Sequence, residues 1–83
     1  MARWTVYEVR AIDRDGECVD VYSHDNLSAA REDFASVFSD SECVAVALEK
    51  VTRFDVPGKE WRYTLLATAG DSCALKAWGG RSD

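Results

Sequence analysis

The most reactive side chains in this chain of 83 residues belong to three cysteines and one histidine. Cys18, Cys43 and Cys73 lie far apart, without a CxxC pair, and His24 is the single imidazole. A zinc site needs closely spaced Cys and His ligands, and a disulfide framework needs an even number of cysteines, so this set fits neither. We therefore expect three reduced thiols, no metal site and no cofactor.

Cys18 and His24 form the one pair that suggests catalysis, because a thiol with an imidazole is the minimum for a nucleophilic cysteine. The other interpretation is that the cysteines are small apolar residues in partly buried positions. The sequence contains no glycine-rich phosphate loop, HExxH motif or GxSxG motif, and so small a domain has little room for a catalytic pocket. We expect a protein that is not an enzyme, with a thiol enzyme as the alternative.

Carboxylates are the other chemically active groups, and they are concentrated in one part of the chain. Residues 13–42 contain nine acidic residues against two arginines, a local charge of −7, whereas the whole chain carries −5. This charge argues against binding to nucleic acid through its phosphates. Two interpretations remain: the acids keep the protein soluble, or they face a basic partner, where they would occupy the places of phosphates.

Elements predicted from the hydrophobic pattern must position these groups. Alternation of apolar and polar residues predicts a strand over about residues 3–13 and another over 18–22. A three-residue loop of residues 14–16, with Gly16 in a left-handed conformation, keeps the apolar residues on one face. It pairs Ala11 with Val19, Val9 with Val21 and Arg10 with Asp20. A two-residue loop would instead place the charge of Arg10 opposite Val21.

The middle of the chain predicts an amphipathic helix followed by a second hairpin. Apolar residues at helical spacing are Leu27, Ala30, Phe34, Val37 and Phe38. Asn26 is the expected N-cap, with Ser28 as the alternative. Residues 43–54 and 61–68 are predicted strands, joined by a turn around Pro57 and Gly58. Their register pairs Phe54 with Trp61, Thr52 with Tyr63 and Leu48 with Ala67, on the helix side together with Val44 and Val46.

These elements predict a single α+β domain over residues 1–78. We expect one four-stranded antiparallel sheet in ββαββ chain order, with one helix packed on one face. The order of strands within the sheet stays open, and residues 70–78 fit either a short edge strand or a helical turn with Leu75 and Trp78. Residues 79–83 are expected to form a mobile tail.

The sheet face without the helix would carry aromatic residues among charged ones such as Glu8, Arg10 and Glu49. It is either an ordinary solvated face or an interface with a partner or a second copy of the chain. The candidate partner-binding residues are the acids Asp13, Asp15, Glu17 and Asp20, then Glu32 and Asp33 on the helix, and the aromatic residues Trp4 and Tyr22.

In length, acidity, few cysteines and a lone α+β domain, the chain resembles the small acidic proteins of phages and mobile elements, including anti-CRISPR inhibitors. The likeness extends over the whole chain but includes no motif, so it assigns no residue a role. It implies binding rather than catalysis, with inhibition of a nucleic-acid-binding complex. No apolar run approaches the roughly 18 residues of a membrane span, and no signal-peptide stretch opens the chain. We expect a cytoplasmic protein that binds a basic protein or complex and contacts neither nucleic acid nor membrane; a homodimeric structural module is the alternative.

Overall fold

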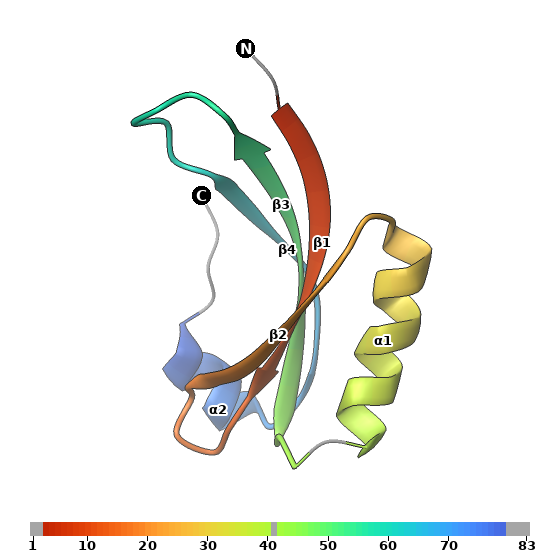
Figure 1. The fold of residues 1–83 in the computed structure, drawn as a ribbon. Helices are drawn as coiled ribbons and strands as arrows, with labels where there is room; N and C mark the ends of the chain where they lie inside the picture. Colours follow the sequence, from red (N-terminus) through yellow and green to blue (C-terminus); the bar gives the residue numbers. More distant parts are fainter. Residues whose placement is uncertain (1–2, 41, 80–83) are drawn as a thin grey trace.

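A computed structural model describes residues 3–40 and 42–79 of the chain, so residues 80–83 of the expected mobile tail lie outside the described part. The elements, in chain order, are β1 (Arg3–Ile12), β2 (Cys18–His24), α1 (Leu27–Asp40), β3 (Ala45–Phe54), β4 (Arg62–Gly70) and α2 (Ser72–Trp78). The strands form one antiparallel sheet in the order β2-β1-β3-β4 (Figure 1). The predicted α+β class, the four-stranded antiparallel sheet and both hairpins are therefore correct.

β1 and β3 form the centre of the sheet. They pair without interruption from Arg3 opposite Phe54 to Ile12 opposite Ala45. Most residues of these two strands are buried on both faces, whereas β2 and β4 are mostly exposed edge strands. The sequence of β3 is thus apolar along most of its length because both of its faces are buried, as expected for an interior strand.

α1 covers one face of the sheet. Its N-cap is Asn26, as predicted, because Asn26 Oδ1 accepts a hydrogen bond from Ala29 N at 2.8 Å. The buried residues of this core are Val9, Ala11, Ala30, Val37, Val46 and Leu48. Val44 was expected in this core but packs on the opposite face of the sheet. It lies just before β3, where its backbone N–H donates to Ile12 O and its carbonyl oxygen accepts a hydrogen bond from Asp71 N.

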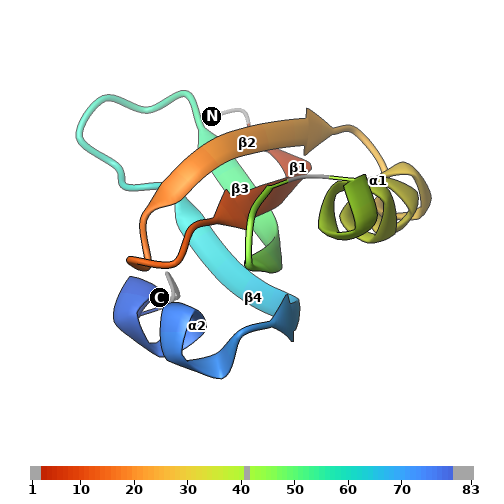
Figure 2. The ribbon, with the colours of Figure 1, turned by 90° about the horizontal axis from the view of Figure 1, so that it is seen from below.

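A second helix, α2, packs on the opposite face, so the prediction of one helix on one face is wrong (Figure 2). Asp71 caps it by accepting hydrogen bonds from Cys73 N and Ala74 N at 2.8 and 3.0 Å, and Gly79 ends it in a left-handed conformation. Ala74 is buried against Ile12, Ala45 and Ala47. Of the two alternatives for residues 70–78, the helical turn is therefore correct for residues 72–78, whereas Gly70 ends β4.

The first hairpin has the predicted three-residue loop but not the predicted register. Ile12 lies opposite Cys18, as that loop requires, and a β-bulge at Val19 then shifts the pairing by one residue. The observed pairs are Ala11 with Asp20, Arg10 with Val21 and Val9 with Tyr22. The prediction assumed that Arg10 needs a solvated face, whereas Arg10 is buried among carboxylates and Val21 is 46% exposed.

The second hairpin contains a similar shift. Leu48 pairs with Ala67 as predicted, but a bulge at Leu66 then places Thr52 opposite Arg62 and Val51 opposite Tyr63. The predicted pairs of Thr52 with Tyr63 and Phe54 with Trp61 are therefore wrong. The turn itself is as expected: Lys59 N donates to Val56 O at 3.2 Å, and Gly58 has a φ of 82°, which fits a type II turn with Pro at its second position.

The sheet curves away from α1, and its concave face looks toward α2 (Figure 1). Bulges increase strand twist and bend the strand, and this sheet carries one in each outer strand. From the register, the concave face holds Trp4, Val6, Glu8, Arg10 and Ile12 of β1, Val21 of β2, Ala45, Ala47, Glu49, Val51 and Arg53 of β3, and Tyr63 and Leu65 of β4.

Candidate binding surfaces

The acidic turn between β1 and β2 is held in shape by its own first carboxylate. Asp13 Oδ1 accepts hydrogen bonds from the backbone N–H groups of Asp15 and Glu17, both at 2.9 Å. Gly16 N donates to Asp13 O at 3.0 Å, and Gly16 has a φ of 84°. Asp13 therefore has a structural role, while the side chains of Asp15 and Glu17 are exposed.

Two of the predicted acids contribute to one hollow beside this turn. Its volume is about 400 Å³, and it is lined by Asp13, Val19, Asp20, Glu42 and Cys43, which we call the acidic notch. Acidic residues of the turn, of β2 and of the segment after α1 thus line one concavity. The bulge leaves the Val19 side chain 53% exposed there. Glu42 belongs to the acidic segment of the sequence, but no local pattern indicates that the connection between α1 and β3 lies beside this turn.

The two helix acids have different surroundings. Glu32 is exposed. Asp33 Oδ2 lies 2.7 Å from His24 Nε2, and both side chains are 25% exposed. This pair joins the end of β2 to α1, so Asp33 is held by an internal contact.

Cys18 and His24 are not brought together. They lie at opposite ends of β2, about 20 Å apart at the usual rise of an extended strand. Cys18 Sγ lies 3.9 Å from Arg10 Nη1 and 3.4 Å from Asp20 O, and His24 contacts Asp33. A catalytic pair of these two residues is absent from the described part of the chain.

Trp4 and Tyr22, expected on one sheet face, lie on opposite faces. Tyr22 is opposite Val9 on the α1 side, because the bulge at Val19 reverses the orientation of the rest of β2. Trp4 is opposite Arg53 on the concave face. Both rings remain exposed, to 39% for Tyr22 and 45% for Trp4.

A buried charged cluster of Glu8, Arg10, Glu49 and Arg53 occupies the concave face. Glu8 lies directly opposite Glu49 on the neighbouring strand. Arg10 bridges the two acids: its Nη2 lies 2.7 Å from Glu8 Oε1, and its Nε donates to Glu49 Oε1. Arg53 forms a further ion pair with Glu8, with Nη2 3.1 Å from Oε2. Glu49 is fully buried, and Glu8 and Arg10 are only 6% and 7% exposed. Of the two interpretations of this face, an ordinary solvated face therefore does not hold for Glu8, Arg10 and Glu49.

The cluster contains two carboxylates and two guanidinium groups, so its formal charges balance. Burial lowers the pKa of Arg10, but hydrogen bonds to Glu49 and Cys18 and the charges of Glu49 and Glu8 raise it more, so the pKa lies above the ordinary value. Aromatic rings line the outer side: the Arg53 guanidinium carbon lies 4.7 Å from the centre of the Trp61 ring, and that of Arg10 lies 5.9 Å from Tyr63. These ion pairs and ring contacts offset part of the cost of burying the charges within the sheet.

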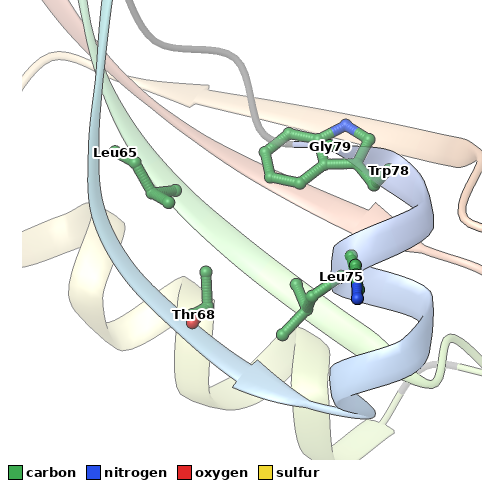
Figure 3. Close-up of a pocket in the computed structure, with 6 residues that line it drawn as sticks. Leu65, Thr68, Leu75, Trp78 and Gly79 are labelled. Atoms are coloured by element: carbon green, nitrogen blue, oxygen red, sulfur yellow. The ribbon is translucent and has the colours of Figure 1, made fainter.

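A second hollow, which we call the α2 pocket, lies between β4 and α2 (Figure 3). Its volume is about 400 Å³, and its lining consists of Leu65, Thr68, Leu75, Lys76, Trp78 and Gly79. The sequence pattern marked Leu75 and Trp78 only as apolar residues of an unassigned segment. Nothing in the local sequence indicates that Leu65 of β4 lies across from them.

Metal and membrane sites are the remaining classes. Within residues 3–40 and 42–79, no three Cys, His, Asp or Glu side chains are arranged to hold a metal ion. None of the helices in the described chain has both the length and the apolar character to cross a membrane.

Comparison with protein-family models, with curated proteins and with solved structures gives no match to this chain.

Proposed function

We propose that this chain is a non-catalytic binding protein whose acidic notch receives a basic side chain of a macromolecular partner. The observation that carries this proposal is the convergence of Asp13, Asp20 and Glu42 from three segments around one hollow. The partner we propose is a basic protein or protein complex in the cytoplasm. Inhibition of a nucleic-acid-binding complex, as in anti-CRISPR proteins, is the activity we propose.

The composition of the notch favours arginine over lysine. Its rim offers carboxylates, and a guanidinium forms paired hydrogen bonds with a carboxylate that an ammonium cannot form. Its apolar part is the exposed side chain of Val19 with the partly buried Cys43. The methylene stem of an arginine can pack on such a surface while its charged end reaches the rim.

The other predicted partner-binding residues near the notch are of two kinds, an aromatic residue and exposed acids. Tyr22 lies two residues from Asp20 on the same face of β2, so it is the aromatic residue that we assign to this interface. The exposed acids Asp15, Glu17 and Glu32 extend the negative field and are assigned to steering. Neutralising Asp15 and Glu17 is expected to slow association and to weaken its dependence on ionic strength.

A homodimeric module is the second candidate function, and the concave face favours it. Trp4 and Leu65 on this face are 45% and 40% exposed, and Trp61, whose ring contacts Arg53, is 40% exposed. Exposed aromatic residues near an arginine are enriched at interfaces. A dimer through this face predicts concentration-dependent sedimentation that Trp4→Ala abolishes, whereas a monomer at all concentrations would exclude it.

Affinity capture from the native host, followed by mass spectrometry, tests the proposed function. The notch variant Asp20→Asn/Glu42→Gln removes two charges from the lining. The control variant Asp25→Asn/Glu60→Gln removes two charges from exposed positions outside the notch. We expect the wild type and the control to capture the same basic partner and the notch variant to lose it. Equal capture by all three proteins would mean that the notch has no role in binding.

A further inference from the structure

We propose that the α2 pocket is a separate site for a small amphipathic carboxylate, a molecule with an apolar body and a single carboxylate group. The pocket volume of about 400 Å³ falls within the range of small-molecule sites, which are mostly apolar with a few polar groups. This pocket has that composition, and the chemistry of its lining selects the ligand.

The apolar part of the lining comes from two elements. Leu75 and Trp78 are three residues apart on α2 and therefore share one face of the helix, and both pack against the buried cluster of Ile12, Ala45, Ala47 and Ala74. Leu65 lies across from them on β4, as Figure 3 shows, and is 40% exposed. An apolar ligand body between these side chains would remove apolar surface from water on both sides, which favours binding.

The polar part of the lining favours an anion. Among the six lining residues, Lys76 carries the only charge, and Thr68 supplies a hydroxyl group. A carboxylate can pair with the ammonium group and accept a hydrogen bond from the hydroxyl. The acidic notch, in contrast, would repel the same ligand, and the acids of the notch do not line this pocket.

Three probe molecules that share the same apolar chain and differ in the charge of their head group separate the apolar from the charged contribution to binding. Octanoate, octan-1-ol and octylammonium, all below their aggregation concentrations, are titrated into the full chain. A Trp4→Phe/Trp61→Phe background leaves Trp78 as the single tryptophan, and both replaced rings are exposed. We expect saturable changes in Trp78 fluorescence, with octanoate bound more tightly than octanol on the order of two- to fivefold, as for an exposed ion pair, and octylammonium bound most weakly.

Two lysine variants test the charge. Lys76→Gln is expected to abolish the preference for octanoate over octanol while octanol still binds. Lys50→Gln is the matched control, because Lys50 is exposed and does not line the pocket; the preference should remain unchanged in it. A preference that survives Lys76→Gln would overturn the assignment of the carboxylate to Lys76.

A third variant tests the place of binding. Leu65→Asn replaces part of the apolar lining with a polar group at a position that is already partly exposed. It adds no charge opposite the buried Glu49, so the fold should tolerate it. Octanoate binding should fall at least tenfold, and amide shifts in the wild type should change along β4 and α2. No saturable binding of octanoate to the wild type, or shifts confined to other elements, would overturn the proposal.

Discussion

Gly16 in the acidic turn lies against Ala77 of α2 so closely that a Cβ at Gly16 would be 2.5 Å from the Cβ of Ala77. The turn is therefore not a free hairpin tip, because one side of it supports the last turn of α2. Asp15 and Glu17 are exposed on a backbone that is held by the Asp13 carboxylate and by contact with α2. A turn held in this way would present Asp13 to the proposed partner without further loss of conformational entropy.

Gly16→Ala should destabilise the protein by about 2 kcal/mol or more, because it adds both a strained left-handed residue and a clash with α2. Gly58→Ala is the control, since Gly58 has a nearly equal φ of 82° and nothing within 4 Å of the added Cβ. The control should cost only about 1–2 kcal/mol from backbone strain. Urea unfolding measures the free energy of unfolding of both variants. Equal losses of stability in the two variants would contradict the packing of the turn on α2.

Arg10→Met should destabilise the protein by about 3–5 kcal/mol, because it leaves the buried Glu8 and Glu49 facing each other without the bridging charge. Arg62→Met, at an exposed position, should change stability by about 0.5 kcal/mol or less. The double variant Arg10→Met/Glu49→Leu should recover part of the loss, since Glu8 keeps Arg53. A single Arg10 variant as stable as the Arg62 variant would contradict the buried charged cluster.

The same cluster predicts how stability depends on alkaline pH. A base whose pKa is raised on folding contributes stability below its unfolded pKa and loses it only as the pH passes the folded value. Because the pKa of Arg10 is raised, its contribution should be constant from about pH 7 to about pH 10. The difference in unfolding free energy between wild type and Arg10→Met should therefore not fall across this range; a steady decrease would contradict it.

Asp71→Ala should weaken α2 and cost about 1 kcal/mol, because the carboxylate caps the N–H groups of Cys73 and Ala74. Asp71→Asn, which keeps an acceptor oxygen, should cost less. Hydrogen exchange of the α2 amides locates the effect, and these amides should exchange faster in the Ala variant alone. Unchanged exchange would mean that α2 does not depend on this cap.

Cys73 should react first when the native protein is alkylated, since it is exposed and the other two thiols are partly buried. Mass spectrometry of the peptides after a short exposure to iodoacetamide measures the order. Preferential labelling of Cys18 would instead indicate a reactive thiol beside Arg10.

Local patterns predict the elements of this fold well, because the signals for them are short in range. The Asn26 cap, the Pro57-Gly58 turn and the three-residue loop before Cys18 each depend on residues close in sequence. α2 is harder to predict, because its seven residues are too few for helical periodicity to be distinct and its stability comes from tertiary packing.

The two bulges explain most of the errors about the candidate sites. An extra residue at Val19 moves Tyr22 and Asp20 to the α1 side, and one at Leu66 shifts Tyr63. The hydrophobic pattern predicted the opposite because it treated Arg10 as solvated, while its partner Glu49 is distant in sequence. The notch likewise combines the first hairpin with residues just before β3, which the pairing of β1 with β3 brings together. The α2 pocket forms where α2 folds back beside β4.

The most direct test of the proposed function is the binding kinetics of the purified partner with the wild type, the notch variant Asp20→Asn/Glu42→Gln and the control Asp25→Asn/Glu60→Gln, at two ionic strengths. A basic side chain held in the notch predicts that the notch variant raises Kd at least about tenfold, mainly through faster dissociation. The control should change Kd by less than about twofold, through a slightly slower association. Equal Kd values and equal dissociation rates for the two variants would contradict recognition through the acidic notch.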